Sequence, residues 1–158
     1  MEEINIRSAE LRDIPALGRL LYEVHKVHSD VRPDLFKAGA RKYTDEQLEE
    51  ILQSGERPVF VAEQDGQVVG YAFCIPKQFV GDRSMTDVRT LYIDDLCVDE
   101  AARGKHIGTK LYGFVLDFAK RQGYYNVTLN VWADNKAAVK FYEKIGLGVQ
   151  KIGMEKIL

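Results

Sequence analysis

The chain has few cysteines and histidines, the residues that are typical of metal-binding and disulfide-rich proteins. It contains two cysteines and three histidines among 158 residues. Cys74 and Cys97 each lie in an apolar, strand-like run, at a spacing that fits no metal motif, so we interpret both as buried free thiols. His25 and His28 are one helical turn apart but have no third ligand nearby in the sequence. We therefore expect no metal site.

Long hydrophobic runs and a large excess of one charge are also missing. No apolar stretch approaches the roughly 20 residues that span a bilayer, and the acidic N-terminal segment does not resemble a signal peptide. The formal net charge is −2, which disfavours nucleic-acid binding because phosphate neutralisation needs a basic face. We expect a cytoplasmic protein without membrane or nucleic-acid partners.

What is present is the composition of a packed globular protein. Hydrophobic residues make up 46% of the chain and charged residues 29%. No low-complexity tract, internal repeat or linker interrupts the sequence. A chain of this length can bury a sizeable core. The sequence therefore predicts a single domain over residues 1–158.

Hydrophobic spacing predicts alternating strands and helices. Thr44 and Gln47 form a T-x-x-Q capping box, and Asp65-Gly66 between two apolar runs is typical of a hairpin. Helices are expected after Asp13, after Thr44, over about 104–122 and over 135–145. Strands are expected at 3–7, 58–63, 67–75, 90–99 and 125–132, with short closing strands at 147–152 and 154–158. The order βααβββαβαββ predicts an α/β fold whose mixed sheet has helices on both faces.

Small and basic residues stand where a strand gives way to the third long helix, in RGKHIG at 103–108. The unpaired N–H groups and partial positive charge of a helix N-terminus bind phosphate readily. Gly104 and Gly108 would let an anion approach the backbone, and Arg103 and Lys105 add charge. The turn predicts a phosphate or pyrophosphate site but matches neither a P-loop nor a dinucleotide-binding motif. A turn with solvated basic side chains is the alternative.

Two motifs in this chain resemble the GNAT superfamily of acetyl-CoA-dependent N-acetyltransferases. V-D-E-A-A-R-G-K-H-I-G at 98–108 resembles the family's Q/R-x-x-G-x-G/A motif, with Arg103 and Gly108 in the outer positions. N-K-A-A-V-K-F-Y-E-K-I-G at 135–146 resembles its N-x-x-A-x-x-F-Y-x-x-x-G segment. The element order is also the family's. His106 replaces the middle glycine of the first motif, and we expect it to be helical, with its ring pointing outward.

The resemblance implies acetyl-CoA as the cofactor. The pantetheine arm would lie along Leu96, Cys97 and Val98 like an additional strand, and the first N–H there would stabilise the oxyanion. The pyrophosphate would lie on the turn from Gly104 to Thr109. The complete set of expected cofactor contacts is Leu96, Cys97, Val98, Arg103, Gly104, Lys105, His106, Ile107, Gly108, Thr109, Asn135, Lys136, Ala137 and Tyr142.

The implied reaction is attack of a neutral amine on a thioester, which requires a proton acceptor. Asp94 and Asp95 are adjacent carboxylates in an apolar strand, a costly arrangement unless they are paired or solvated. Because successive side chains alternate, at most one should face the substrate unless a bulge intervenes. Asp94 matches the family's proposed glutamate base and is our first choice. Asp95, an ordered water and a purely structural role for both carboxylates are the alternatives.

The resemblance also implies a proton donor. The tyrosine of the family's F-Y pair lies close to the CoA sulfur, and a phenol can donate to a thiolate, which makes Tyr142 the expected acid. The alternative is that Tyr142 packs in the core beside Phe141. Acylation of Cys97 is disfavoured because no histidine base is near it in the sequence.

The acceptor is the least determined part of the prediction. YIDDLCV at 92–98 resembles a strand of the spermidine/spermine type of small-amine acetyltransferase, so we expect a small primary amine. Phe36, between the first two helices, and Trp132, at a strand end, are expected acceptor contacts together with Asp94 and Asp95. Basic residues around Phe36 argue against a purely cationic acceptor. A peptide N-acetyltransferase and a non-catalytic acyl-CoA-binding module are the alternatives, and a homodimer is a further expectation from the family.

Overall fold

A five-stranded mixed sheet organises the chain. The computed structural model describes residues 3–102 and 106–158. The strand order is β1-β2-β3-β4-β5; the first four strands pair antiparallel, and β5 pairs parallel with β4. The strands are β1 (Ile4–Ser8), β2 (Val59–Gln64), β3 (Gln67–Lys77), β4 (Thr90–Val98) and β5 (Asn126–Leu129).

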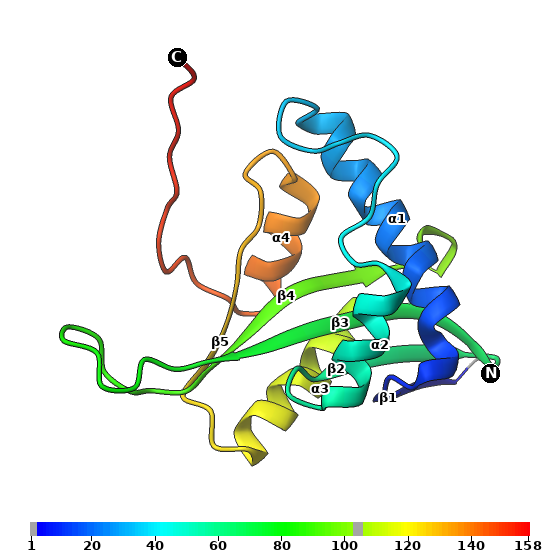
Figure 1. Cartoon of the computed structure of the whole chain (residues 1–158), viewed down its shortest axis with the longest axis horizontal. Helices are drawn as coiled ribbons and strands as arrows, with labels where there is room; N and C mark the ends of the chain where they lie inside the picture. Colours follow the sequence, from blue (N-terminus) through cyan, green and yellow to red (C-terminus); the bar gives the residue numbers. More distant parts are fainter. Residues whose placement is uncertain (1–2, 103–105) are drawn as a thin grey trace.

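Helices lie on both faces of this sheet. They are α1 (Ile14–Val31), α2 (Asp45–Ser54), α3 (Ile107–Arg121) and α4 (Lys136–Lys144), with short 3-10 turns at Leu11–Asp13 and Glu100–Ala102. Figure 1 shows α1 and α2 on one face and α3 on the other. The predicted capping box starts α2, since Thr44 Oγ1 accepts from Gln47 N at 3.2 Å and Gln47 Oε1 accepts from Thr44 N at 2.9 Å.

The core has two layers because β3 is buried on both sides. Tyr71 and Phe73 point towards α1 and α2, where they join a cluster built on leucines of those helices. Ala72 and Cys74 point towards α3 and pack with its apolar stripe. The α/β prediction of a mixed sheet between helical layers is confirmed. Among the described residues, no helix is both long and apolar enough to cross a membrane.

The predicted closing strands are wrong for this chain. Residues 147–158 form no strand; after α4 they run as an extended segment apart from the sheet (Figure 1, red), and Glu155 in this segment accepts a hydrogen bond from Arg32. Alternating apolar residues predict a strand, but a strand also needs a neighbouring edge to pair with. The segment lies apart from the sheet, so its backbone has no neighbouring strand edge to pair with.

Candidate active site

A bulge in β4 brings both carboxylates to one face of the sheet. The β3–β4 register shifts so that Phe73 pairs with Asp95 and Cys74 with Ile93, which leaves Asp94 as the extra residue. Ile93 packs on the α3 side, whereas Asp95 bonds to Tyr71 on the α1–α2 side. Two residues opposite one on the partner strand is the signature of a β-bulge. Asp94 and Asp95 therefore share the face that strict alternation would have divided between them.

Asp94 ties the loop between α1 and α2 to this face. Its carboxylate accepts hydrogen bonds from Lys42 Nζ at 2.8 Å and from Tyr43 Oη at 2.7 Å. Burial, the hydrogen bond to Asp94 and the negative charge of Asp94 raise the pKa of Tyr43, so the phenol stays protonated and donates. Asp94 thus accepts two side-chain hydrogen bonds and holds Lys42 over the sheet.

Asp95 has a different environment one residue later. Its carboxylate accepts a hydrogen bond from Tyr71 Oη at 2.9 Å, and the Tyr71 side chain is completely buried. Burial raises the pKa of Asp95 to about 6, although the Tyr71 hydrogen bond and the charge of Lys42 oppose that rise. A buried carboxyl group disfavours its charged form. Asp95 is therefore ionised at neutral pH but is a stronger base than an ordinary carboxylate.

Tyr142 of α4 completes the group. Burial raises the pKa of Tyr142 to about 12, with smaller contributions from Asp95 and Cys97. The Tyr142 ring also meets Phe141 edge to face, with the ring centroids 5.2 Å apart. Tyr142 is therefore protonated and can donate a proton. Its ring also packs beside Phe141, as the alternative core role of Tyr142 predicts.

The sheet opens beside these residues because only the first half of β4 pairs with β5. The parallel register joins Thr90–Ile93 to Asn126–Leu129, and β5 ends there. Within the described residues, β5 contributes no pairing to the β4 backbone from Asp94 to Val98. An extended pantetheine arm fits such an open strand edge. The predicted contacts at Leu96, Cys97 and Val98 all lie on this edge.

The predicted phosphate turn is described only in part. Arg103, Gly104 and Lys105 lie outside the described residues. The expectation that His106 is helical is wrong: it precedes α3 with φ 59° and ψ 25°, in the left-handed region. Few non-glycine residues adopt this conformation, which glycine adopts without strain. The backbone conformation thus explains why a glycine suits the middle position of this motif.

Gly108 has a packing role that its sequence position did not indicate. A Cβ at this residue would lie 3.1 Å from Phe141 Cζ and 3.7 Å from Val98 Cγ2. The missing side chain lets α3, α4 and the end of β4 converge. Ile107 beside it is fully buried, whereas Thr109 is exposed on the first turn of α3.

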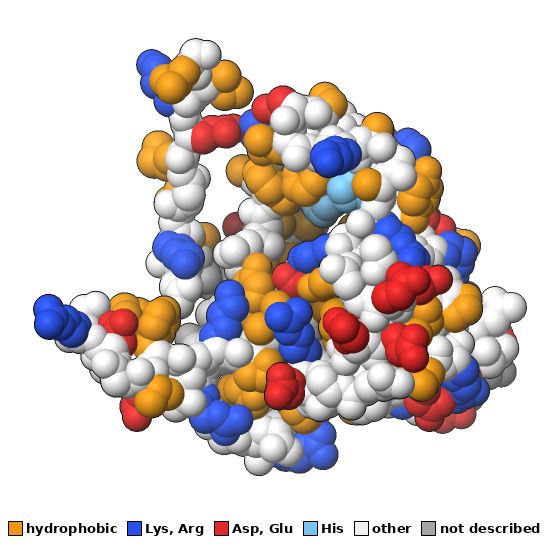
Figure 2. Space-filling model, viewed as in Figure 1, with side chains coloured by type: hydrophobic (Ala, Val, Ile, Leu, Met, Phe, Trp, Pro, Cys, Tyr) orange, Lys and Arg blue, Asp and Glu red, His pale blue; other side chains and the backbone are white. Residues whose placement is uncertain are grey.

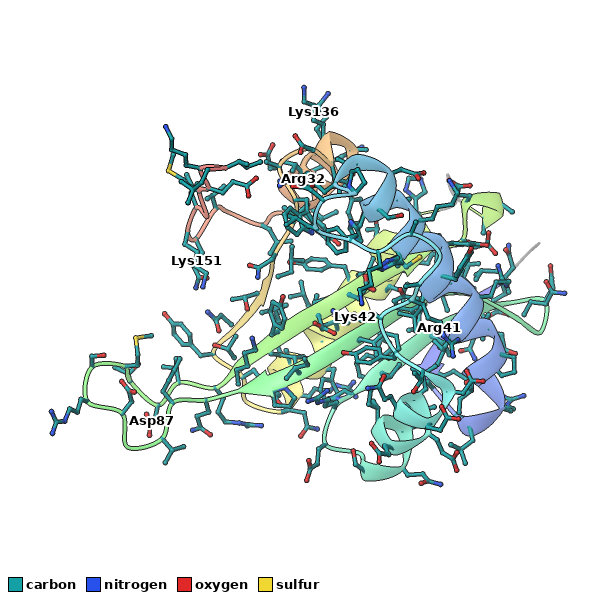
Figure 3. All side chains as sticks on the ribbon, turned by 45° about the horizontal axis from the view of Figure 1, so that its top comes forward. Arg32, Arg41, Lys42, Asp87, Lys136 and Lys151 are labelled. Carbon is teal, nitrogen blue, oxygen red and sulfur yellow. The ribbon has the colours of Figure 1, made fainter. Side chains whose placement is uncertain are left out.

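The other predicted cofactor contacts lie at the start of α4. Asn135 caps this helix, its Oδ1 accepting from Ala138 N at 3.2 Å. Lys136 and Ala137 are exposed, and Figure 3 shows Lys136 pointing outward from the molecule. This hydrogen bond gives Asn135 a structural role as the N-cap of α4. Its contact with the cofactor stays a prediction.

An aromatic cluster joins Phe36 and Trp132, two of the four predicted acceptor contacts. Phe36 meets the ring of Trp132 edge to face at 5.5 Å, stacks on His28 at 5.1 Å and meets His25 edge to face at 5.7 Å. This cluster connects α1, the loop after it and the segment after β5. Sequence reasoning missed the two histidines as part of the site, although their spacing of one helical turn placed them on one helix face.

Charge also gathers around this opening. Burial lowers the pKa of His28, and the nearby His25 and Lys42 lower it further, so His28 is neutral at pH 7. Lys77 Nζ lies 3.9 Å from the centroid of the Tyr92 ring, farther along the same face. Figure 2 shows this face hollowed, with histidine and basic side chains at the border of the hollow. Lys77 and Tyr92 gave no signal in the sequence.

Comparison with known proteins agrees with this geometry. The profile of the Acetyltransferase (GNAT) family matches residues 24–147. This range contains the β4 bulge, the α3 N-terminus and α4. The chain therefore belongs to the GNAT family of acetyltransferases.

Individual relatives cover the chain to different extents. A BH1408 protein from Bacillus halodurans has a solved structure that superposes with a TM-score of 0.92 and 28% identity, covering 98% of this chain and 99% of that one. Glucosamine 6-phosphate N-acetyltransferase of Arabidopsis thaliana is 32% identical over 71% of this chain and 73% of its own length. An N-acetyltransferase from Methanocaldococcus jannaschii is 28% identical over 65% of this chain, and the match spans 44% of that longer protein.

Proposed function

We propose that this protein transfers the acetyl group of acetyl-CoA directly to the primary amine of a small molecule. The observation that carries the proposal is the convergence of a base and an acid on the open half of β4. Asp95 lies on the bulged strand, and Tyr142 lies on α4, which meets the end of that strand beside Gly108. The open edge between them suits an extended thioester arm.

The residues divide the reaction between them. Acetyl-CoA supplies an activated acetyl thioester. The backbone of Leu96, Cys97 and Val98 would hold the pantetheine arm, and an N–H on this edge would stabilise the oxyanion. Asp95 accepts the proton that the acceptor ammonium loses, directly or through a water. Tyr142 donates its phenolic proton to the departing thiolate.

We assign the base to Asp95 rather than to Asp94, our first choice from the sequence. Asp94 already accepts hydrogen bonds from both Lys42 and Tyr43, which tie it to the loop between α1 and α2. Asp95 accepts from Tyr71, and its pKa of about 6 lies closer to neutrality. A general base works best with a pKa near the working pH. Asp94 then acts by positioning Lys42.

The charges around the opening favour an acceptor that carries an anionic group as well as its amine. Lys42 is held at the carboxylates, and Lys77 lies on the same sheet face. A polyamine would meet these cations unfavourably, whereas an amino sugar phosphate or an amino acid would not. The Arabidopsis relative named for glucosamine 6-phosphate fits this class. A polyamine and a peptide amine are the competing acceptors.

An acceptor panel scored by release of the CoA thiol tests the proposal. The panel contains polyamines, amino sugars with and without phosphate, amino acids and short peptides with free N-termini. We expect turnover with a phosphorylated or carboxylated amine. Lys42→Gln should raise the KM of that acceptor about tenfold, because one charged hydrogen bond is lost. Lys26→Gln, whose lysine pairs with Asp30 on α1, is the matched control.

Each other outcome would assign a different function to this protein. Turnover confined to peptides makes it a protein acetyltransferase. Turnover confined to polyamines retains the enzyme but rejects the anionic group. Tight binding of acetyl-CoA with no thiol release from any acceptor makes it a non-catalytic acyl-CoA-binding module.

A further inference from the structure

A buried hydroxyl group on β3 contacts one carboxylate of the site without belonging to the expected machinery. Tyr71 lies in the middle of β3, and its side chain is completely buried. Its hydroxyl donates to Asp95 Oδ2 at 2.9 Å. Burying a hydroxyl costs free energy unless it is hydrogen-bonded. A phenylalanine would fill this space without that cost, as Phe73 does two positions later on the same face. The hydroxyl therefore points to a use beyond packing.

The strand register and the packing fix where this hydroxyl lies. Tyr71 is directly opposite Cys97 in the β3–β4 ladder, and Phe73 is opposite Asp95. The Tyr71 hydroxyl thus reaches diagonally to Asp95, a distance that aromatic side chains span on one face of a sheet. The Tyr71 ring meets Phe73 edge to face at 4.9 Å, and Phe73 packs against Tyr43 at 5.5 Å. A ring held in this way gives the Asp95 carboxylate a fixed donor.

Several titratable groups surround Asp95. They come from four parts of the fold: Lys42 and Tyr43 in the loop before α2, Tyr71 on β3, Asp94 and Cys97 on β4, and Tyr142 on α4. Burial is the main cause that raises the pKa of Asp95 to about 6, and the charge of Asp94 adds to the rise. The Tyr71 hydrogen bond is the strongest influence that lowers this pKa, ahead of the charge of Lys42.

The Tyr71 hydroxyl stays a donor throughout the pH range in which Asp95 titrates. Burial, followed by the nearby Asp95 and Cys97, raises the pKa of Tyr71 well above its ordinary value. A hydrogen bond donated to a carboxylate favours the ionised form of that carboxylate. Without the hydroxyl, the buried Asp95 would therefore be harder to ionise.

We propose that Tyr71 is a positioning residue for the base: its hydroxyl orients the Asp95 carboxylate on the bulged strand and keeps it ionised. This inference rests on the proposed function, in which Asp95 accepts the proton that the acceptor ammonium loses. Tyr71 keeps its own proton throughout and acts only through Asp95. The bulge brings Asp95 to this face, and the β3 hydroxyl prepares it for proton transfer.

A carboxyl ¹³C NMR titration of the protein without ligands tests the hydrogen bond directly. We expect Asp95 to titrate near pH 6 in the wild type and about one pH unit higher, or more, in Tyr71→Phe. Asp95→Asn identifies the signal. Tyr112→Phe is the matched control, since Tyr112 is buried on the opposite face of the sheet, towards α3. An unchanged Asp95 midpoint in Tyr71→Phe overturns the proposal, whatever reaction the protein catalyses.

The pH dependence of kcat/KM tests the positioning role. In Tyr71→Phe the rising limb should move with the NMR midpoint, so that the loss is about fivefold at pH 6 and shrinks as pH rises. Added to Asp95→Asn, Tyr71→Phe should cause no further loss, because it acts through this carboxylate. A loss of equal size at every pH, or one that multiplies the loss from Asp95→Asn, would indicate a merely structural role and overturn the proposal.

The two measurements also separate this inference from the proposed function. A shifted NMR midpoint together with an unshifted rising limb would place the base elsewhere, and Tyr71 would then lose its role in the reaction although its hydrogen bond stands. No thiol release from any acceptor would reject the proposed function itself. Circular dichroism of Tyr71→Phe and Tyr112→Phe checks that both variants fold, as expected for a change that keeps the ring.

Discussion

The two halves of β4 differ in their strand pairing and in their role. Thr90–Ile93 lies between β3 and β5, pairs with both and alternates regularly. From Asp94 onwards the strand keeps only β3 as a partner, after a bulge that adds one residue. The first half contributes stability through Leu91 and Ile93, which are buried. The second half has a backbone edge that β5 leaves unpaired and carries two partly buried carboxylates, which is what binding and proton transfer require.

This comparison teaches that the site is made by interrupting a regular element. A bulge re-aims side chains and ends pairing with little change elsewhere in the sheet. Here it places Asp94 beside Lys42 and Tyr43, and Asp95 beside Tyr71. Five predictions follow, and the first of them test whether function belongs to the open half alone.

The largest expected effect is the loss of the acid at the open half. Tyr142→Phe should lower kcat by about 10²–10⁴-fold, the usual contribution of general acid catalysis. The acetyl-CoA dissociation constant should change less than about threefold, because the ring keeps its packing. Steady-state kinetics and calorimetry measure the two quantities. Tyr124→Phe, which changes a tyrosine packed against Arg89, is the control. Full turnover in Tyr142→Phe would remove this residue from the mechanism.

Asp95→Asn should lower kcat/KM about 10²-fold and change the pH profile. In the wild type, the limb that rises with pH should have its midpoint near pH 6, since the base must be ionised. That limb should disappear in the variant. Asp117→Asn on the exposed face of α3 should leave the profile as it is. A midpoint unchanged by Asp95→Asn would assign the base elsewhere.

The same variant should be more stable than the wild type at pH 7. The pKa of Asp95 is raised from 3.8 to about 6 on folding, so its contribution to stability is fully present below about pH 4 and is lost as pH rises through 6. Removing the charge should therefore stabilise the fold by roughly 1–3 kcal/mol at pH 7. Urea denaturation at pH 4 and pH 7 checks this, because the difference should vanish at the lower pH.

Deletion of Asp94 tests the bulge directly. Without this residue, Ile93 and Asp95 become neighbours, and the pairs Cys74–Ile93 and Phe73–Asp95 form a regular ladder. The faces of Ile93 and Leu96 are unchanged, so the chain should still fold. Turnover should fall about 10²-fold or more, because without Asp94 nothing on the strand holds Lys42 and Tyr43 in their places at the site. A deletion variant with normal turnover would show that the bulge is not needed.

The smallest expected effect concerns the α3 N-terminus. His106→Gly should raise the free energy of unfolding by up to about 1 kcal/mol, because His106 has a left-handed backbone that glycine adopts without strain. Thermal denaturation measures the change. Gly113→Ala, a glycine inside α3 with open space around it, is the comparison: it raises stability through helix propensity alone. A loss of stability in His106→Gly would mean that the imidazole makes a contact worth more than the strain.

Local patterns in the sequence were enough to identify most elements and the family. The capping box at Thr44 and the hairpin at Asp65-Gly66 involve neighbours in sequence, so their residue types determine the outcome. Asn135, Phe141 and Tyr142 likewise belong to one helix and its N-cap. These features follow from backbone conformations and side-chain faces that a few adjacent residues decide.

Tertiary structure alone decided the rest. Whether Asp94 or Asp95 faces the site depends on a register shift against β3, which neither strand shows by itself. The contact of Trp132 with Phe36, which stacks on His28, joins the segment after β5 to α1 and the loop after it, far away in the chain. The closing strands failed for the same reason, since an apolar alternation fixes which face a residue takes but not where its pairing edge lies. Pairing, register and long-range packing are properties of two segments at once, and a single stretch of sequence specifies only one of them.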